Sequence, residues 1–166
     1  MLSGRLVITG VAGCGKTSLA RALAADSRGV CIDADDLHPP ANRARMAAGE
    51  PLREADRLPW LRKVADAARS ADGDPVLVAC SALKRRYRDL LRRAAACRFV
   101  YLHITPELAR ARVASRAEHF FSPDLVASQF ACLEQPGQYM VDECRRYLTG
   151  EPLRWQVTQE AAARMA

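Results

Sequence analysis

Three features are missing from this sequence of 166 residues, and each absence excludes a class of protein. No apolar run approaches the ~18 residues that span a membrane, and no apolar signal-peptide core follows the N-terminus. The six cysteines form no C-x-x-C pair, so neither a zinc site nor a disulfide framework is indicated. No internal repeat, low-complexity tract or domain linker interrupts the chain. We therefore expect a single domain over residues 1–166, located in the cytoplasm and without a membrane partner.

The composition is that of an ordinary globular domain. A chain of this length can bury about 70% of the surface that its unfolded form exposes. The formal net charge of +6 would suit nucleic acid, but the arginines are spread over several predicted helices and form no single basic tract. Binding of small anionic molecules explains the excess charge equally well, and we expect no nucleic-acid partner.

A glycine-rich loop near the N-terminus carries the clearest chemical signal. Residues 10–17 match the pattern G-x-x-x-x-G-K-[ST], between an apolar strand pattern at 6–9 and apolar residues at helical spacing. Glycines let backbone N–H groups turn inward around an anion, and the following helix points its N-terminal dipole at the same place. Lys16 would then reach the β- and γ-phosphates of ATP, and the Thr17 hydroxyl would bind Mg²⁺. The predicted phosphate contacts are Gly10, Val11, Ala12, Gly13, Cys14, Gly15, Lys16, Thr17 and Ser18.

Two carboxylates follow the second predicted strand, Val30–Asp33. Ligands bind at the carboxyl ends of strands in α/β proteins. Asp33 and Asp35 alternate along an extended chain, so both are expected to face the phosphate loop. The roles needed there are a Mg²⁺ ligand, which we give to Asp33 with Thr17, and a base for a substrate hydroxyl, which we give to Asp35. The alternative is that these acids are solvated turn residues that cap the next helix.

Two helices are predicted between residues 39 and 71. The shorter helix is started by proline and stops at Gly49. The longer helix spans residues 56–71, with Pro59 tolerated in its first turn and Trp60 on its apolar face. We interpret Trp60 as a core residue.

A series of short motifs runs through the same region. In order, they are Asp33-x-Asp35-x-x-His38-Pro39, Asn42, Met46, Gly49-Glu50-Pro51-Leu52, Asp56-Arg57 and Pro59-Trp60. This series resembles that of the bacterial gluconokinase family. The resemblance implies a P-loop kinase that phosphorylates D-gluconate at its 6-hydroxyl, with His38 and Arg57 among the substrate-binding residues.

A second block begins at the third predicted strand, Val76–Cys80. The run Cys80-Ser81-Ala82-Leu83-Lys84, followed by Tyr87-Arg88-Asp89-Leu90-Leu91, is similar to the same family's most distinctive motif. Lys84 and Arg88 lie at i and i+4, so one helix face would carry two cations that can hold a sugar-acid carboxylate. A basic, solvated helix face is the alternative reading of this pair.

The fourth predicted strand, Arg98–Ile104, leads into a helix that begins with a Thr105 cap and a proline. This helix carries Arg112 and Arg116, again at i and i+4. Residues 112–124 look like the lid of the resembled family. An arginine from a closing lid can neutralise charge on the transferred phosphoryl group, and Arg116 is the prediction, with Arg112 close behind. The alternative is a pair of helix-surface arginines.

The resemblance spans about residues 6–137 and departs from the family in two places. The chain has Ala117-Glu118-His119 where the family usually has Lys-Gly-His, so a permissive glycine is replaced by a bulky acid. Residues 138–166 form an atypical C-terminal segment, in which Arg154–Thr158 is the candidate for a fifth strand. The contacts to adenine are therefore not assigned.

Alternating strand and helix signals predict an α/β fold with a mainly parallel sheet and helices on both faces. The resemblance implies the three-layer P-loop kinase fold, five strands in the order 2-3-1-4-5, and a homodimer. The predicted catalytic residues are Lys16, Asp35 and Arg116, and Arg112 and Arg116 join the nucleotide contacts. The predicted substrate contacts are Asp35, His38, Arg57, Ser81, Lys84, Arg88, His119 and Gln129.

Two other functions are compatible with parts of the sequence. One is a P-loop kinase for another small hydroxylated acid, such as a different aldonate. A shikimate kinase should show a Gly-Gly-Gly run at the end of strand three, where this chain has Cys80-Ser81-Ala82. The other is a nucleotide-dependent protein that binds nucleic acid, which would use the positive charge and need no small acceptor.

Overall fold

Four parallel strands form the centre of the molecule. The computed structural model describes residues 2–115 and 121–136. Within them, β1 (Arg5–Thr9), β2 (Val30–Asp33), β3 (Val76–Ala79) and β4 (Arg98–Tyr101) pair in the order β2-β3-β1-β4. The register places Val7 of β1 opposite Val78 of β3 and Phe99 of β4. Since every pairing is parallel, the carboxyl ends of the strands lie at one edge of the sheet.

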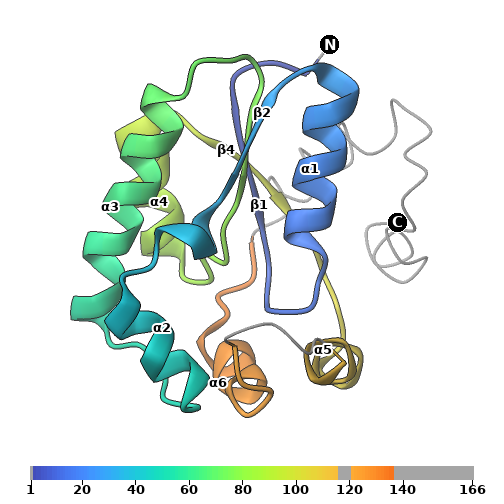
Figure 1. Cartoon of the computed structure of the whole chain (residues 1–166), viewed down its shortest axis with the longest axis vertical. Coiled ribbons are helices and arrows are strands. Elements are labelled where there is room, and N and C mark those ends of the chain that lie inside the picture. Colours follow the sequence, from blue (N-terminus) through green and yellow to red (C-terminus); the bar gives the residue numbers. More distant parts are fainter. Residues whose placement is uncertain (1, 116–120, 137–166) are drawn as a thin grey trace.

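Helices cover both faces of this sheet and its carboxyl edge. Figure 1 shows α1 (Lys16–Ser27) on one face, and α3 (Glu54–Ser70) and α4 (Arg85–Ala95) side by side on the other. The three shorter helices gather at the carboxyl ends of the strands: α2 (Pro40–Ala47), α5 (Pro106–Ala114) and α6 (Leu125–Cys132). The α/β architecture with helices on both faces is confirmed.

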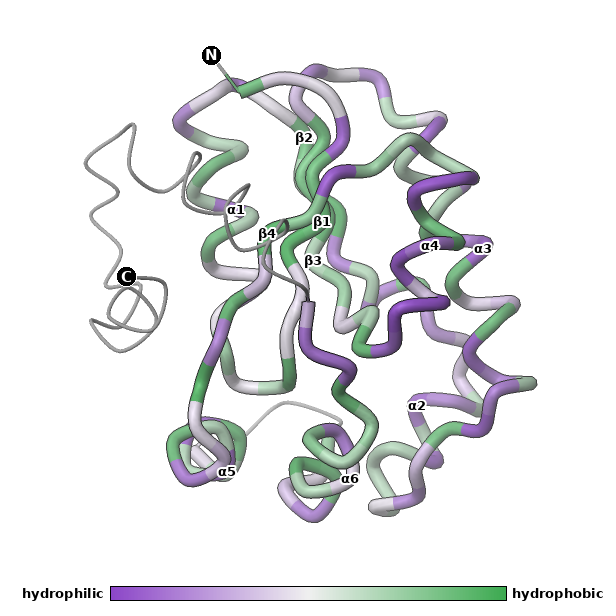
Figure 2. Tube along the Cα trace, turned by 180° about the vertical axis from the view of Figure 1, so that it is seen from behind, coloured by the Kyte–Doolittle hydropathy of each residue, from purple (hydrophilic) through white to green (hydrophobic). Residues whose placement is uncertain are grey.

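The sheet is the core of the domain. Leu6, Val7, Ile8, Leu77 and Val78 are completely buried, and the strand region is green in the hydropathy view of Figure 2. Strands that are covered on both faces read as continuous apolar runs, which is why residues 6–9 and 76–79 were recognisable as strands. The edge strand β2 is only half-buried.

The strand predictions are confirmed within one residue for β1, β2 and β3, but β4 is shorter than predicted. The last ladder contact is the N–H of Leu102, which donates to the Thr9 carbonyl at the end of β1 (2.8 Å). The apolar run continues to Ile104 because this side chain packs into a separate cluster with Val11 of the phosphate loop and residues of α5. The apolar pattern after β4 therefore indicates residues that are buried outside the sheet.

One of the two helices predicted between residues 39 and 71 begins earlier in the structure. The helix predicted over 56–71 starts at Glu54, because the Asp56 carboxylate caps it by accepting a hydrogen bond from the Arg53 N–H (3.0 Å). Pro59 therefore lies in the second turn. The shorter helix ends before Gly49, whose φ of +76° stops it as predicted.

The predicted fifth strand, Arg154–Thr158, and the C-terminal segment 138–166 lie outside the described residues, as do residues 116–120 of the predicted lid. Among residues 2–115 and 121–136, none of the helices combines the length and hydrophobicity of a membrane span.

Candidate active site

The phosphate loop connects β1 to α1, and its shape depends on glycine. Gly13 and Gly15 have φ values of +82° and +97°, which disfavour residues with a Cβ. A Cβ on Gly10 would lie 2.6 Å from the Leu102 carbonyl oxygen, and one on Gly13 would lie 2.8 Å from that of Ala109. The loop therefore packs closely against Leu102, just after β4, and Ala109 of α5. It leads into the N-terminus of α1, where helices bind anions.

Three side chains bond to the tip of this loop. The Lys16 ammonium donates to the Val11 carbonyl (3.0 Å), and the Ala12 N–H donates to Oε1 of Gln129 from α6 (2.6 Å). The Arg112 guanidinium donates to the Gly13 carbonyl (3.3 Å). Arg112 is predicted to contact nucleotide, and this bond places its guanidinium beside the phosphate loop.

A hydroxyl and a carboxylate meet beside the loop. The Thr17 hydroxyl donates to Oδ2 of Asp33 (2.8 Å), so the two predicted metal ligands adjoin. The other oxygen of Asp33 accepts from the Asp35 N–H (3.1 Å) and caps a 3₁₀ turn, Ala34–Leu37. Asp33 therefore caps the turn, as the alternative interpretation expects. It also lies beside the Thr17 hydroxyl, as a Mg²⁺ ligand would.

The expected alternation of Asp33 and Asp35 along an extended chain is wrong, although Asp35 lies beside the phosphate loop. The chain stops being extended after Asp33, so the two acids do not alternate along a strand. The 3₁₀ turn instead brings Asp35 to the wall of the pocket next to the phosphate loop.

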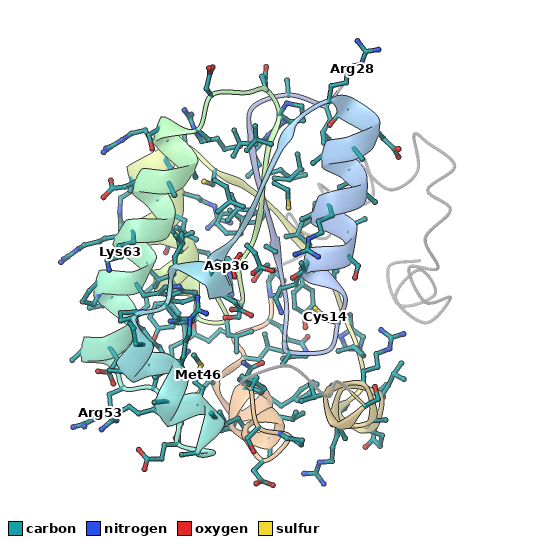
Figure 3. The ribbon with its side chains drawn as sticks, viewed as in Figure 1. Cys14, Arg28, Asp36, Met46, Arg53 and Lys63 are labelled. Atoms are coloured by element: carbon teal, nitrogen blue, oxygen red, sulfur yellow. The ribbon has the colours of Figure 1, made fainter. Side chains whose placement is uncertain are left out.

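One pocket at the carboxyl edge of the sheet joins the loop to the α2 side of the molecule. Its nucleotide end is lined by Ala12, Gly13, Gly15, Lys16 and Thr17. Of the predicted substrate contacts, its walls contain Asp35, His38, Arg57, Ser81 and Gln129. The remaining lining residues are Met46, Pro51, Leu52, Trp60, Phe121, Leu125 and Ser128. Figure 3 labels Cys14 of the loop and Met46 of α2, which lie on opposite sides of this region.

His38 is a buried, neutral histidine. Its ring stacks on Trp60 with 4.1 Å between centroids and 13° between planes, and the residue is 7% exposed. Burial lowers the pKa of His38 to about 4, and the positive charges of Arg57 and Arg43 act in the same direction. Its Nδ1 is buried and has no hydrogen-bond partner within the described part of the chain. The ring faces the pocket as a neutral group at pH 7.

Trp60 is a core residue, as predicted, and it also forms part of the pocket wall. It is 2% exposed, and its indole N–H donates to the Ala34 carbonyl (2.7 Å). This bond ties α3 to the 3₁₀ turn that carries Asp35. The Trp60 side chain therefore supports both His38 and the turn that presents the predicted base.

Arg57 is the cation of the pocket wall on the α3 side. Its Nε donates to the Leu52 carbonyl (3.1 Å), which anchors the guanidinium to the segment between α2 and α3. The planar fork of an arginine suits a carboxylate, because two N–H groups can donate side by side.

The predicted cationic helix face of Lys84 and Arg88 is not formed. Lys84 is the extended N-cap of α4, and Arg88 is turned inward and 4% exposed. The Arg88 guanidinium donates to the carbonyls of Ala82 (3.2 Å), Leu83 (2.8 Å) and Glu134 (2.9 Å). Neither cation lines the pocket. Helical spacing misled here, because the helix begins one residue after Lys84.

The helix expected to carry both Arg112 and Arg116 ends at Ala114. Arg116 and His119 lie outside the described residues. After residue 120, Phe121 and α6 contribute to the pocket wall, with Ser128 and Gln129 as its polar groups.

The pocket contains apolar residues that sequence reasoning did not identify as functional. Met46 and Leu52 pack with Leu125 in a small cluster against Phe121, and all four line the pocket. Their spacing is that of ordinary core residues, so no local signal separates them from the core. Met46 and Leu52 occur in the motifs quoted above, but those motifs carried no role for them.

Parallel strand topology, a glycine loop at the start of α1, and a threonine–aspartate pair beside it define a P-loop protein of the α/β class. A family model described as "AAA domain" matches residues 6–135. At 40% identity, the chain is similar to the thermoresistant gluconokinase of Escherichia coli K12, over 79% of this chain and 77% of that protein. The gluconokinase of Gluconobacter oxydans is 43% identical, and the match covers 80% of this chain and 76% of that protein.

A solved structure gives the same result in three dimensions. The crystal structure of a gluconokinase from Sinorhizobium meliloti 1021 has a TM-score of 0.73 and 35% identity, and the match covers 96% of this chain and 94% of that one. The chain belongs to the gluconokinase family.

Proposed function

We propose that this protein transfers the γ-phosphoryl group of ATP to the 6-hydroxyl of D-gluconate, giving 6-phospho-D-gluconate and ADP. The observation that carries the proposal is the composition of a single pocket. The phosphate-loop residues Lys16 and Thr17 line it together with a carboxylate, Asp35, and an arginine, Arg57. A kinase for a sugar acid needs these groups in one site: a phosphate cradle, a base for the hydroxyl and a cation for the carboxylate.

The nucleotide half of the proposal uses the loop amides and Lys16 to hold the phosphates. Thr17 and Asp33 fit Mg²⁺, because a hydroxyl and a carboxylate oxygen are the hard ligands that this ion prefers. No group of three or more metal-ligating side chains occurs among the described residues, which suits an ion that completes its shell with phosphate and water. Bound Mg²⁺ would neutralise charge on the phosphates.

The acceptor half uses Asp35 as the base. Its carboxylate takes the proton of the 6-hydroxyl as that oxygen bonds to the γ-phosphorus, and the bond from phosphorus to the β,γ-bridging oxygen breaks to release ADP. Arg57 binds the gluconate carboxylate. Ser81 and His38 bind hydroxyls, for which a neutral ring is suited, since it can donate and accept.

The apolar walls also have a role in this proposal. Met46, Leu52, Phe121 and Leu125 exclude water from the acceptor and contact its C–H faces. Exclusion of water limits hydrolysis of ATP and strengthens the charged contacts. Arg116 would complete the charge stabilisation of the transferring group. The substrate contacts of His119, Lys84 and Arg88 stay predictions. So do the five-stranded order, the lid over 112–124, the homodimer and the cytoplasmic location.

The test is ADP production with ATP and Mg²⁺ over a panel of acceptors: gluconate, other aldonates, shikimate and nucleoside monophosphates. We expect gluconate to stimulate ADP production strongly, and more than any other acceptor of the panel. No stimulation by gluconate, together with clear stimulation by another acceptor, would overturn the assignment and identify the kinase by its substrate.

A further inference from the structure

One peptide group of the phosphate loop is bonded at both ends to side chains. The carbonyl of the Val11–Ala12 peptide accepts from the Lys16 ammonium (3.0 Å), and its N–H donates to Oε1 of Gln129 (2.6 Å). Lys16 is the residue expected to reach the β- and γ-phosphates of ATP. Gln129 belongs to α6, which forms part of the acceptor side of the pocket.

The two bonds strengthen each other. A cation on the carbonyl oxygen polarises the peptide and makes its N–H a better donor, so the contact to Gln129 is strongest while Lys16 stays on Val11. When Lys16 leaves, the carbonyl keeps only the weaker backbone bond from the Cys14 N–H (3.3 Å). Triphosphate binding therefore weakens the Gln129 contact, and a phosphate oxygen is in addition a stronger acceptor for the Ala12 N–H than a neutral amide.

The helix that carries Gln129 is also tied to the acceptor side. The Ser122 N–H, just before α6, donates to the Met46 carbonyl of α2 (3.3 Å), and Leu125 of α6 packs against Met46 and Leu52. After α6, the Glu134 carboxylate accepts from the Arg85 N–H at the start of α4 (2.6 Å). Gln129 and the apolar wall residue Leu125 therefore belong to one helix that is bonded to α2.

We propose that Gln129 is a positioning residue that links the terminal phosphate of ATP to the acceptor wall through the Val11–Ala12 peptide group. In the described arrangement it holds the Ala12 N–H. Once a triphosphate takes that N–H, the freed amide and α6 adopt the arrangement that binds the acceptor. The acceptor then binds more tightly beside ATP than beside ADP. The proposal rests on the proposed function for the identity of the acceptor, gluconate.

The first test measures this coupling directly. Trp60 lines the pocket, so its fluorescence in a Trp155→Phe background reports gluconate binding. We expect gluconate to bind at least about fivefold more tightly with Mg²⁺ and β,γ-imido-ATP than with Mg²⁺ and ADP. Gln129→Met removes the amide oxygen at similar volume. It should bring the ratio of the two gluconate dissociation constants to within about twofold of one. A ratio near one in the parent protein, or an unchanged ratio in Gln129→Met, would overturn the proposal.

Ser128→Ala is the matched control. Ser128 also lies on α6 and lines the pocket, but its hydroxyl bonds within the helix, to the Leu125 carbonyl (2.8 Å). The coupling ratio should be retained in this variant. Loss of the ratio in both variants would show that any disturbance of α6 suffices and would overturn the specific role of Gln129.

A second measurement does not depend on gluconate. The side-chain amide signals of Gln129 in ¹⁵N-labelled protein can be assigned by their absence in Gln129→Met. They should shift with β,γ-imido-ATP and much less with ADP; no difference between the nucleotides would overturn the proposal even if gluconate were not the acceptor. Failure of gluconate to change Trp60 fluorescence in any nucleotide state would instead count against the proposed function. Circular dichroism checks that each variant is folded.

Discussion

The two ends of the pocket are built in different ways. The nucleotide end is made of consecutive residues, 10–17, and its shape comes from backbone conformation and close packing of glycines. The acceptor end is made of side chains from the 3₁₀ turn, α2, α3, the end of β3 and α6. A phosphate cradle is thus a local property of the chain, whereas acceptor recognition depends on how distant elements pack.

The largest effect is expected at the nucleotide end. Lys16→Ala removes the cation that should hold the β- and γ-phosphates, and we expect kcat to fall at least about 10³-fold. The acceptor end should be intact, so the variant should still bind gluconate, as measured by Trp60 fluorescence. Residual kcat within tenfold of the parent enzyme would show that the loop does not act as predicted.

Asp35→Asn tests the chemistry where the two ends meet. The amide keeps the size of the side chain but cannot accept the hydroxyl proton, so kcat should fall about 10²- to 10³-fold with little change in the KM for gluconate. Steady-state kinetics give both constants. A near-normal kcat would remove Asp35 from the role of base.

Arg88 and Lys84 provide a matched pair of cations that the structure separates. Arg88→Met leaves the carbonyls of Ala82, Leu83 and Glu134 without this donor, and we expect the free energy of unfolding to fall by about 3 kcal/mol. Lys84→Met should change it by less than about 0.5 kcal/mol. Urea unfolding measures both. A raised gluconate KM in Lys84→Met would instead support the substrate contact first predicted for that residue.

Arg57→Met tests charge recognition at the acceptor end. We expect the KM for gluconate to rise about 10- to 100-fold with a smaller change in kcat, because the lost contact binds substrate and transition state alike. Gluconamide, which lacks the negative charge, is the control acceptor. If its kinetics suffer as much as those of gluconate, Arg57 supports the pocket and does not bind the carboxylate.

His38 should make stability depend on pH. Its pKa is lowered to about 4 in the folded protein, below the ordinary value near 6.5. The unfolded chain therefore binds a proton first as pH falls, so stability present above pH 6.5 is lost between pH 6.5 and pH 4. Between pH 7 and pH 5 this loss is about 2 kcal/mol. His38→Phe keeps a ring against Trp60 and should lack this part of the pH dependence in urea unfolding; identical pH profiles would contradict the buried neutral state.

Much of the site was predictable, but for two different reasons. The loop was found from one motif, because glycine, lysine and threonine at fixed spacing have a direct physical meaning. Asp35 was predicted because it follows the end of a strand, and Arg57 was predicted through motifs that carry a family resemblance. Their shared pocket could not have been deduced from spacing. The apolar lining residues around Leu125 were not found, because a wall residue and a core residue have the same hydrophobic pattern.

The sequence by itself determined the order of strands and helices, the phosphate loop and the set of polar groups available to it, because backbone preference and short-range periodicity act locally. Tertiary structure decided which of these groups share the pocket. It turned Arg88 into the interior, where carbonyls from two segments meet, and it brought Gln129 across 117 residues to the Ala12 N–H. Such contacts depend on how helices pack on the sheet, and no local pattern encodes that packing.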